Sequence, residues 1–135
     1  MKPILAVLAG GLLGTAARLG VDVALPHGGT DLPLGTFLIN LVGSFGLGVL
    51  VARVWPVAPE WLRAGLGPGL LGSFTTFSAL AVSAVELTAS GVPATAILYV
   101  AASLVGGIAA AAFGIRVGAP PSSSDAPVPA IGPDE

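Results

Sequence analysis

Four apolar segments, each long enough to cross a bilayer, dominate this sequence of 135 residues. A helix needs about 20 apolar residues to span the hydrocarbon core. The segments run from Pro3 to Leu25, from Leu34 to Val54, from Ala64 to Ser90 and from Pro93 to Val117. Only 9% of the residues are charged, against about 25% in soluble domains. The sequence therefore predicts an all-α, multi-pass protein of the cell membrane, with a four-helix transmembrane domain over residues 1–117.

An even number of spans places both chain ends on one side of the membrane. The basic residues outside the first span all fall on that side: Lys2, Arg53, Arg63 and Arg116. The positive-inside rule therefore predicts cytoplasmic termini. Residues 118–135 are rich in Pro, Ser and acidic residues, which predicts a disordered tail. Arg18 and Asp22 in the first segment argue against a cleaved signal peptide.

Small residues recur within every span. Gly10 and Gly14 form a GxxxG pair, as do Gly65 and Gly69. In lipid, such faces let helix backbones approach closely, so they predict tight helix packing. A bundle this small leaves little interior space for a pathway. We therefore expect a dimer with its functional site at the interface.

Composition and residue types exclude several functions. The chain has no cysteine and a single histidine, His27, in a Pro-Gly-rich connection where a solvated loop residue is expected. The net charge of −2 without a basic cluster argues against nucleic-acid binding. No catalytic triad, carboxylate pair, metal cluster or nucleotide loop is present, so we do not expect an enzyme.

Polar side chains inside spans are costly and need an explanation. Arg18 and Asp22 are four residues apart and either pair on one helix face or reach the membrane interface. Asn40 lies within the second span, where its amide either bonds across helices or offers N–H donors to a passing ligand. Tyr99 and Ser103 share one face of the fourth span.

The third span contains the unusual stretch Gly72-Ser73-Phe74-Thr75-Thr76-Phe77-Ser78, just after Pro68 and Gly69. Pro and Gly weaken a helix, and hydroxyls can bond to the freed backbone groups. The stretch predicts a third helix that is broken near its middle, a device with which membrane proteins hold small ions. The alternative is a kinked helix whose hydroxyls bond only to their own backbone. The residues alone leave two functions open, a small-ion pathway or a packed membrane scaffold.

Three blocks of the chain resemble the fluoride channel family known as Fluc or CrcB. They are Gly10-Gly11-Leu12-Leu13-Gly14-Thr15-Ala16-Ala17-Arg18, Gly35-Thr36-Phe37-Leu38-Ile39-Asn40-Leu41-Val42-Gly43-Ser44-Phe45 and Gly69-Leu70-Leu71-Gly72-Ser73-Phe74-Thr75-Thr76-Phe77-Ser78. The resemblance runs from about Gly10 to Gly114. It implies an antiparallel, dual-topology dimer with two narrow pores at the interface, which exports fluoride passively and relieves its toxicity.

The resemblance also implies roles for individual residues. The fluoride pore falls on Asn40, Phe77, Ser78, Leu80, Tyr99 and Ser103. Arg18 matches a vestibule residue that attracts anions. A structural sodium ion, Na+, at the dimer centre would be held by the main-chain carbonyls of Gly72 and Thr75.

Two positions depart from the family pattern. Leu80 stands where the family has its second pore phenylalanine, which implies a degraded half-site, and Ser83 stands where an acidic residue is often found. Together with the basic bias, the missing ring suggests one subunit of a heterodimer of homologous chains, as an alternative to a homodimer.

Two other readings compete with the channel. A small multidrug exporter would need an embedded carboxylate in the first span, for which only Asp22 is available. A non-transporting assembly subunit would use its polar residues only for packing. The ordered Thr75-Thr76-Phe77-Ser78 block argues against that role.

Overall fold

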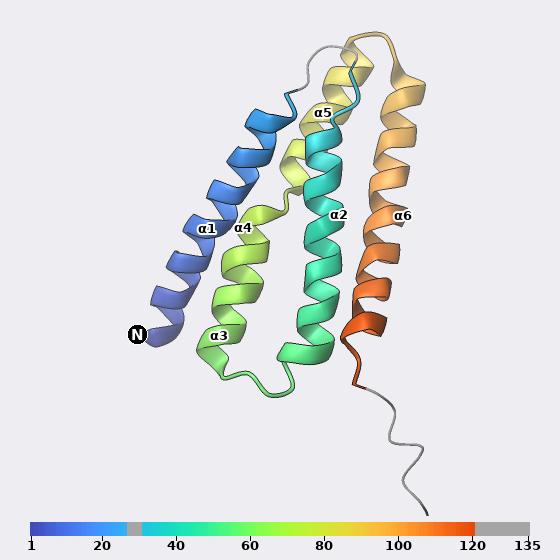
Figure 1. Ribbon diagram of the computed structural model, residues 1–135. Helices are drawn as coiled ribbons and strands as arrows, with labels where there is room; N and C mark the ends of the chain where they lie inside the picture. Colours follow the sequence, from blue (N-terminus) through green and yellow to red (C-terminus); the bar gives the residue numbers. More distant parts are fainter. Residues whose placement is uncertain (27–30, 121–135) are drawn as a thin grey trace, which may run out of the picture.

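The computed structural model describes residues 1–26 and 31–120, and every regular element within them is a helix (Figure 1). The elements in chain order are α1 (Lys2–Ala24), α2 (Leu34–Val49), the π-helical η1 (Leu50–Val54), α3 (Glu60–Ala64), the π-helical η2 (Gly65–Leu71), α4 (Gly72–Phe74), α5 (Phe77–Ala89) and α6 (Pro93–Gly118). The predicted loop position of His27 and nearly all of the predicted tail lie outside the described residues.

Four helical spans in the described residues are long and apolar enough to cross a membrane, as the sequence predicted. They cover Lys2–Ala24, Leu34–Val54, Glu60–Ala89 and Pro93–Gly118. Three of them match the predicted bounds within one residue at each end. The third begins four residues earlier than predicted, because the helix starts directly after Pro59 with a polar turn that hydropathy alone does not reveal.

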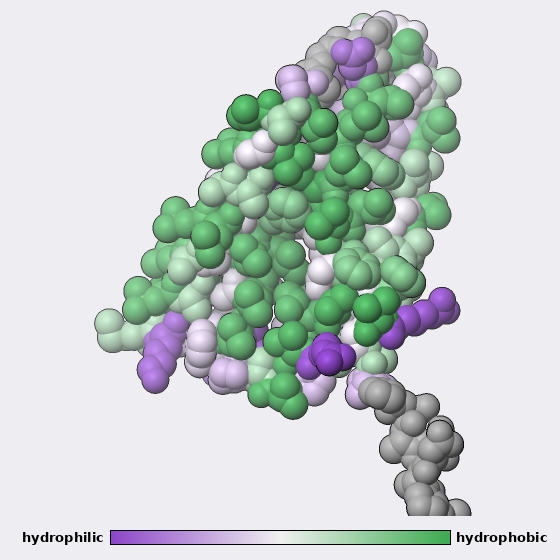
Figure 2. All heavy atoms as spheres, viewed as in Figure 1, coloured by the Kyte–Doolittle hydropathy of each residue, from purple (hydrophilic) through white to green (hydrophobic). Residues whose placement is uncertain are grey.

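The spans run alternately up and down, so the N-terminus and the end of α6 lie at the same end of the bundle (Figure 1). Hydrophobic residues cover the face of the bundle between its two ends, and hydrophilic residues gather near those ends (Figure 2). Most large apolar side chains point outward, including Leu12 and Val23 of α1 and Ile108 of α6. This arrangement suits a lipid environment, where apolar side chains need no burial within the protein.

Glycines let the helix pairs approach closely. A Cβ added at Gly10 or Gly14 of α1 would collide with main-chain carbonyls of η2. On the other side of the bundle, a Cβ at Gly48 of α2 would collide with α6, and one at Gly114 of α6 would collide with α2. The tight packing that the small residues predicted is therefore confirmed. It fixes the third span between α1 and the α2–α6 pair (Figure 1).

Candidate functional site

The third span is interrupted at two residues, between α4 and α5. Thr75 has φ −76° and ψ 155°, and Thr76 has φ −150° and ψ 120°, so both are extended. The helix axis bends only slightly across them, and α5 resumes in the same general direction (Figure 1). The hydroxyl of Thr75 donates to the Leu71 carbonyl at 2.8 Å, and the Thr76 hydroxyl accepts from the Ala79 N–H at 3.1 Å. The two threonines thus cap the helical parts on either side.

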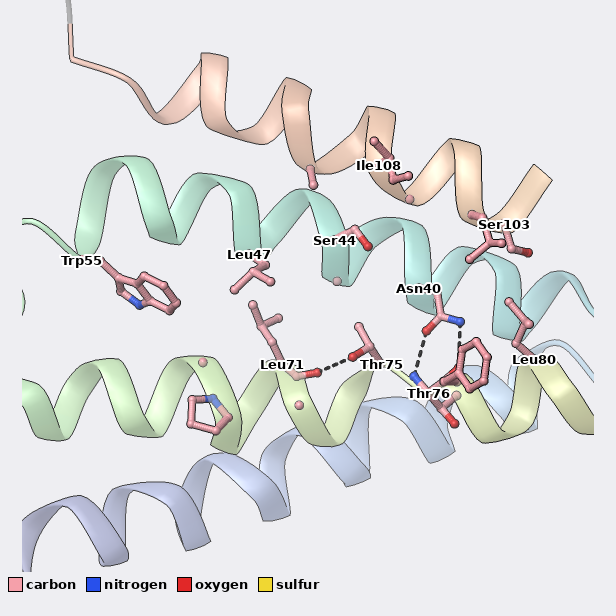
Figure 3. A pocket seen from close by; sticks show the side chains of 18 residues that line it. Asn40, Ser44, Leu47, Trp55, Leu71, Thr75, Thr76, Leu80, Ser103 and Ile108 are labelled. Carbon is pink, nitrogen blue, oxygen red and sulfur yellow. Dashed lines mark hydrogen bonds between the residues drawn. The ribbon is translucent and has the colours of Figure 1, made fainter. Parts of the chain in front are cut away.

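Asn40 of α2 bonds to the interruption through both ends of its amide (Figure 3). Its Nδ2 donates to the Thr76 carbonyl at 2.9 Å, and its Oδ1 accepts from the Thr76 N–H at 2.8 Å. The sequence left interhelical bonding and ligand donation open for this residue. The structure shows interhelical bonding, and it leaves one of the two Nδ2 hydrogens for another acceptor.

The bond to Asn40 changes the environment of the Gly72 carbonyl. In a continuous helix this carbonyl would accept from the N–H of Thr76, four residues later. Here the Thr76 N–H goes to Asn40, and the Thr75 N–H goes to Leu71 at 2.9 Å. The Gly72 carbonyl therefore loses its helical donor. A freed main-chain carbonyl is an oxygen ligand that suits a hard monovalent cation such as Na+.

A groove of about 650 Å³ runs along the second and third spans and reaches α6 (Figure 3). Its polar lining includes Asn40, Ser44, Thr75, Thr76 and Ser103. Its apolar lining includes Leu47, Leu71, Phe77, Leu80 and Ile108, and no charged residue of the described chain lines it. The groove thus brings six of the predicted site residues together: Asn40, Gly72, Thr75, Phe77, Leu80 and Ser103.

Four buried hydroxyls meet between α2, α5 and α6. The side chains of Ser83, Thr36 and Ser103 surround the hydroxyl of Tyr99, which is only 5% exposed. Within the part of the chain that the structure describes, the Tyr99 hydroxyl and the Ser103 Oγ are both buried without a hydrogen-bond partner. An unpartnered buried polar atom costs roughly 1–3 kcal/mol. Two of them side by side indicate a place for water or a small ligand.

The remaining predicted residues lie elsewhere. Ser78 is exposed, and its hydroxyl lies 3.1 Å from that of Thr76. The neighbouring Phe77 lines the groove and is 74% exposed. Arg18 is partly buried on α1, and Asp22 is exposed. No ion pair within 4.0 Å joins these two residues in the described part of the chain, so the paired arrangement considered for them does not form.

Leu80 has a different environment from the one the sequence suggested. It is only 5% exposed and packs with Leu87, Ala96 and Tyr99 in the core between α5 and α6. One edge of the side chain still lines the groove. The pore role assigned to position 80 remains a prediction, but in the single chain the side chain also serves helix packing.

Sequence reasoning missed Thr36 and treated Ser83 only as a departure from the family pattern. Both are at most 5% exposed and belong to the hydroxyl cluster. A signal existed for Thr36, which lies four residues before Asn40 on the same helix face. Similarly, Ser83 follows Leu80 by three residues. The sequence could not predict the rotation of α5 about its axis, which turns Ser83 towards Tyr99.

Comparison with known proteins identifies relatives along nearly the whole described chain. Residues 5–115 match the family model described as "CrcB-like protein, Camphor Resistance (CrcB)". The chain is 48% identical over 123 residues to a protein of Rhodospirillum centenum named "Fluoride-specific ion channel FluC", covering 86% of this chain and 97% of that protein.

Two further relatives carry the same kind of name. The chain is 44% identical to "Fluoride-specific ion channel FluC 2" of Halalkalibacterium halodurans, with 84% of each chain covered. It is 40% identical to a protein of that name from Geobacillus kaustophilus, covering 86% of this chain and 92% of that one. The residues matched by the family model include Asn40, Thr75, Thr76 and Tyr99.

Proposed function

This chain belongs to the CrcB family, and on that premise we propose that it is a fluoride-specific ion channel. The channel lets F⁻ leave the cell passively and so reduces fluoride toxicity. It is a multi-pass membrane protein and not an enzyme. One structural observation carries the proposal: the Ser103 hydroxyl, which has no partner among the described residues, lines the same groove as the Asn40 amide, and the unpartnered Tyr99 hydroxyl lies beside Ser103. Neutral donors of this kind can replace part of an anion's hydration shell without trapping it.

A second chain completes the pathway in this proposal. The groove is open along one side and carries the Asn40 amide and the Ser44 and Thr75 side chains. Lipid chains cannot satisfy such polar groups, so another protein surface is needed to cover them. An antiparallel, dual-topology dimer would place the exposed ring of Phe77 against the partner, where the positive ring edge can face an anion. The partner is a second copy or a homologous subunit.

We also propose a structural sodium ion at the dimer centre. The residues fit this role because the Gly72 carbonyl has lost its helical donor and Thr75 is extended beside it. A bound Na+ would offset the repulsion between carbonyl oxygens brought together at the interface. The interruption in the third span would then be the break that frees these oxygens.

Fluoride efflux from liposomes that contain only this chain tests the function. With sodium present and a fluoride electrode as detector, we expect rapid fluoride release and no comparable chloride release; protein-free liposomes give the background. Release only after reconstitution with a homologous chain would support the heterodimer. If folded protein gives no fluoride release in either case, the proposed function is wrong.

The competing exporter has less support. Asp22 is exposed near the end of α1 and does not line the groove. Substrate-dependent proton flux in the same liposomes would be evidence for an exporter.

A further inference from the structure

A third buried polar atom, the indole Nε1 of Trp55, has no hydrogen-bond partner among residues 1–26 and 31–120. It lies at the opposite end of the groove from Ser103 (Figure 3). Trp55 directly follows η1, where its main-chain N–H bonds to the Leu50 carbonyl at 2.9 Å. Its ring rests against Gly67 of η2, where an added Cβ would lie 3.3 Å from the ring. The close approach of this glycine fixes how far the indole enters the groove.

The orientation of Trp55 is unusual for its position. Tryptophans near membrane interfaces commonly direct their N–H to water or head groups. Trp61 is the other tryptophan of the chain and is 43% exposed at the same end. The Trp55 N–H instead faces inward. A buried donor that lacks a hydrogen bond costs roughly 1–3 kcal/mol. An acceptor must therefore come from outside the described residues.

The residues around the Trp55 N–H favour a negatively charged acceptor. The neighbouring groove lining is apolar and comes from Leu47, Pro68 and Leu71, with no carboxylate along the groove. Two of the arginines at this end of the bundle flank the connection that follows Trp55, where the exposed Glu60 contributes one carboxylate. Arg53 precedes Trp55 by two residues, and Arg63 is tied to the connection after Trp55 by a bond from its Nε to the Ala58 carbonyl at 2.8 Å. The basic residues at this end, Lys2, Arg53, Arg63 and Arg116, outnumber this one carboxylate, and net positive charge near an apolar groove raises the local concentration of anions.

We propose that the Trp55 indole N–H is an entry site for a small, partly hydrated anion on the side of the termini. The inference rests on the proposed function, in which this anion is the permeating fluoride. The anion would exchange one water for the indole N–H before it reaches the donors at Asn40 and Ser103. A single neutral donor binds weakly, so the site would load and release quickly.

Nuclear magnetic resonance of the indole groups tests the site directly. The 15N-labelled protein should give two indole cross-peaks, which the Trp61→Phe variant assigns. Sodium fluoride is titrated against sodium isethionate at constant ionic strength, because the bulky isethionate anion does not fit beside the ring. We expect a saturable shift of the Trp55 cross-peak with fluoride alone and little change for Trp61. A Trp55 cross-peak that stays fixed, or moves equally with isethionate, means a water or protein partner and overturns the proposal.

Fluoride efflux from liposomes provides a second test of the Trp55 site. Trp55→Phe keeps the ring that packs on Gly67 and removes only the N–H. We expect it to slow fluoride efflux several-fold, while Trp61→Phe stays close to the wild-type rate. If wild-type protein does not conduct but the Trp55 cross-peak responds to fluoride, the proposed function fails and the site stands. If the wild type conducts and Trp55→Phe conducts equally well, the entry site is wrong and the channel function stands.

Discussion

Asn40 and Thr76 form a two-point contact between α2 and the interruption in the third span, with hydrogen bonds of 2.9 and 2.8 Å. The amide of Asn40 takes the place of a main-chain partner for both the N–H and the carbonyl of Thr76. This contact keeps Thr76 out of the helix and leaves the Gly72 carbonyl without its usual donor. One side chain therefore links the groove to the candidate cation site.

Replacing Asn40 should affect both stability and conduction. Asn40→Ala removes both hydrogen bonds, and we expect the free energy of unfolding to fall by about 1–3 kcal/mol and fluoride efflux to be lost. Asn40→Asp keeps an acceptor for the Thr76 N–H but places a negative charge in the groove. It should therefore unfold less readily than Asn40→Ala and still fail to conduct. Thermal unfolding in detergent and liposome efflux measure the two effects, with Val42→Ala, at an exposed position of the same helix, as the control. Normal efflux from Asn40→Ala would contradict this role.

Removing the unpartnered hydroxyls should separate conduction from stability. Tyr99→Phe and Ser103→Ala each delete a buried hydroxyl that has no partner in the described chain. Because no hydrogen bond is lost, the melting temperature should stay constant or rise. Fluoride efflux should fall about tenfold, which corresponds to a loss of about 1.4 kcal/mol of ion stabilisation. Thr88→Ala, whose hydroxyl bonds to the Ala84 carbonyl at 2.8 Å on the exposed face, is the matched control. A lower melting temperature with unchanged efflux would indicate a packing role instead.

Sodium should stabilise the protein if the freed carbonyls bind it. A ligand that binds only the folded state raises the unfolding free energy with its concentration. We expect the melting temperature to rise saturably with sodium chloride and much less with N-methylglucamine chloride at the same ionic strength. Asn40→Ala should weaken this response, because the Thr76 N–H can return to the Gly72 carbonyl. Equal stabilisation by both salts in the wild type would argue against a specific sodium site.

Restoring an aromatic ring at position 80 should be costly. Leu80 is packed against Leu87, Ala96 and Tyr99, so the larger ring of Leu80→Phe would overfill this core. We expect a loss of about 1–3 kcal/mol in unfolding free energy. Thermal unfolding measures this loss, with Leu80→Met as the control of similar volume. If Leu80→Phe is as stable as the wild type and conducts faster, the side chain at position 80 points into the pore in the assembled protein.

The close contact of α1 with η2 should tolerate no side chain at Gly14. A Cβ there would collide with the Leu70 carbonyl, whereas one added at Gly20 of the same helix would meet no atom within 4 Å. Gly14→Ala should therefore sharply reduce the yield of folded, monodisperse protein in size-exclusion chromatography. In contrast, Gly20→Ala should leave the yield unchanged or raise it, because alanine favours the helix. Equal yields for the two variants would contradict the close contact.

The sequence by itself determined the fold class and, within one residue at each end, the bounds of three of the four spans. Bilayer thickness fixes how many apolar residues a span needs, and that count can be read along the chain without tertiary contacts. The small residues likewise predicted close helix packing. The predicted break in the third helix is confined to two extended residues, Thr75 and Thr76, across which the helix bends only slightly. The resemblance to fluoride channels rested on the same short blocks.

Only the tertiary structure decided what each polar side chain meets. The partner of Asn40 lies 36 residues away, and nothing in the amino-acid sequence distinguished Thr76 from a ligand as that partner. The same holds for the hydroxyls around Tyr99, the burial of Leu80 and the inward turn of Trp55. Each depends on how a helix is rotated about its own axis. In a bundle that is apolar on nearly every face, hydrophobic periodicity does not set that rotation, and close contacts between backbones do.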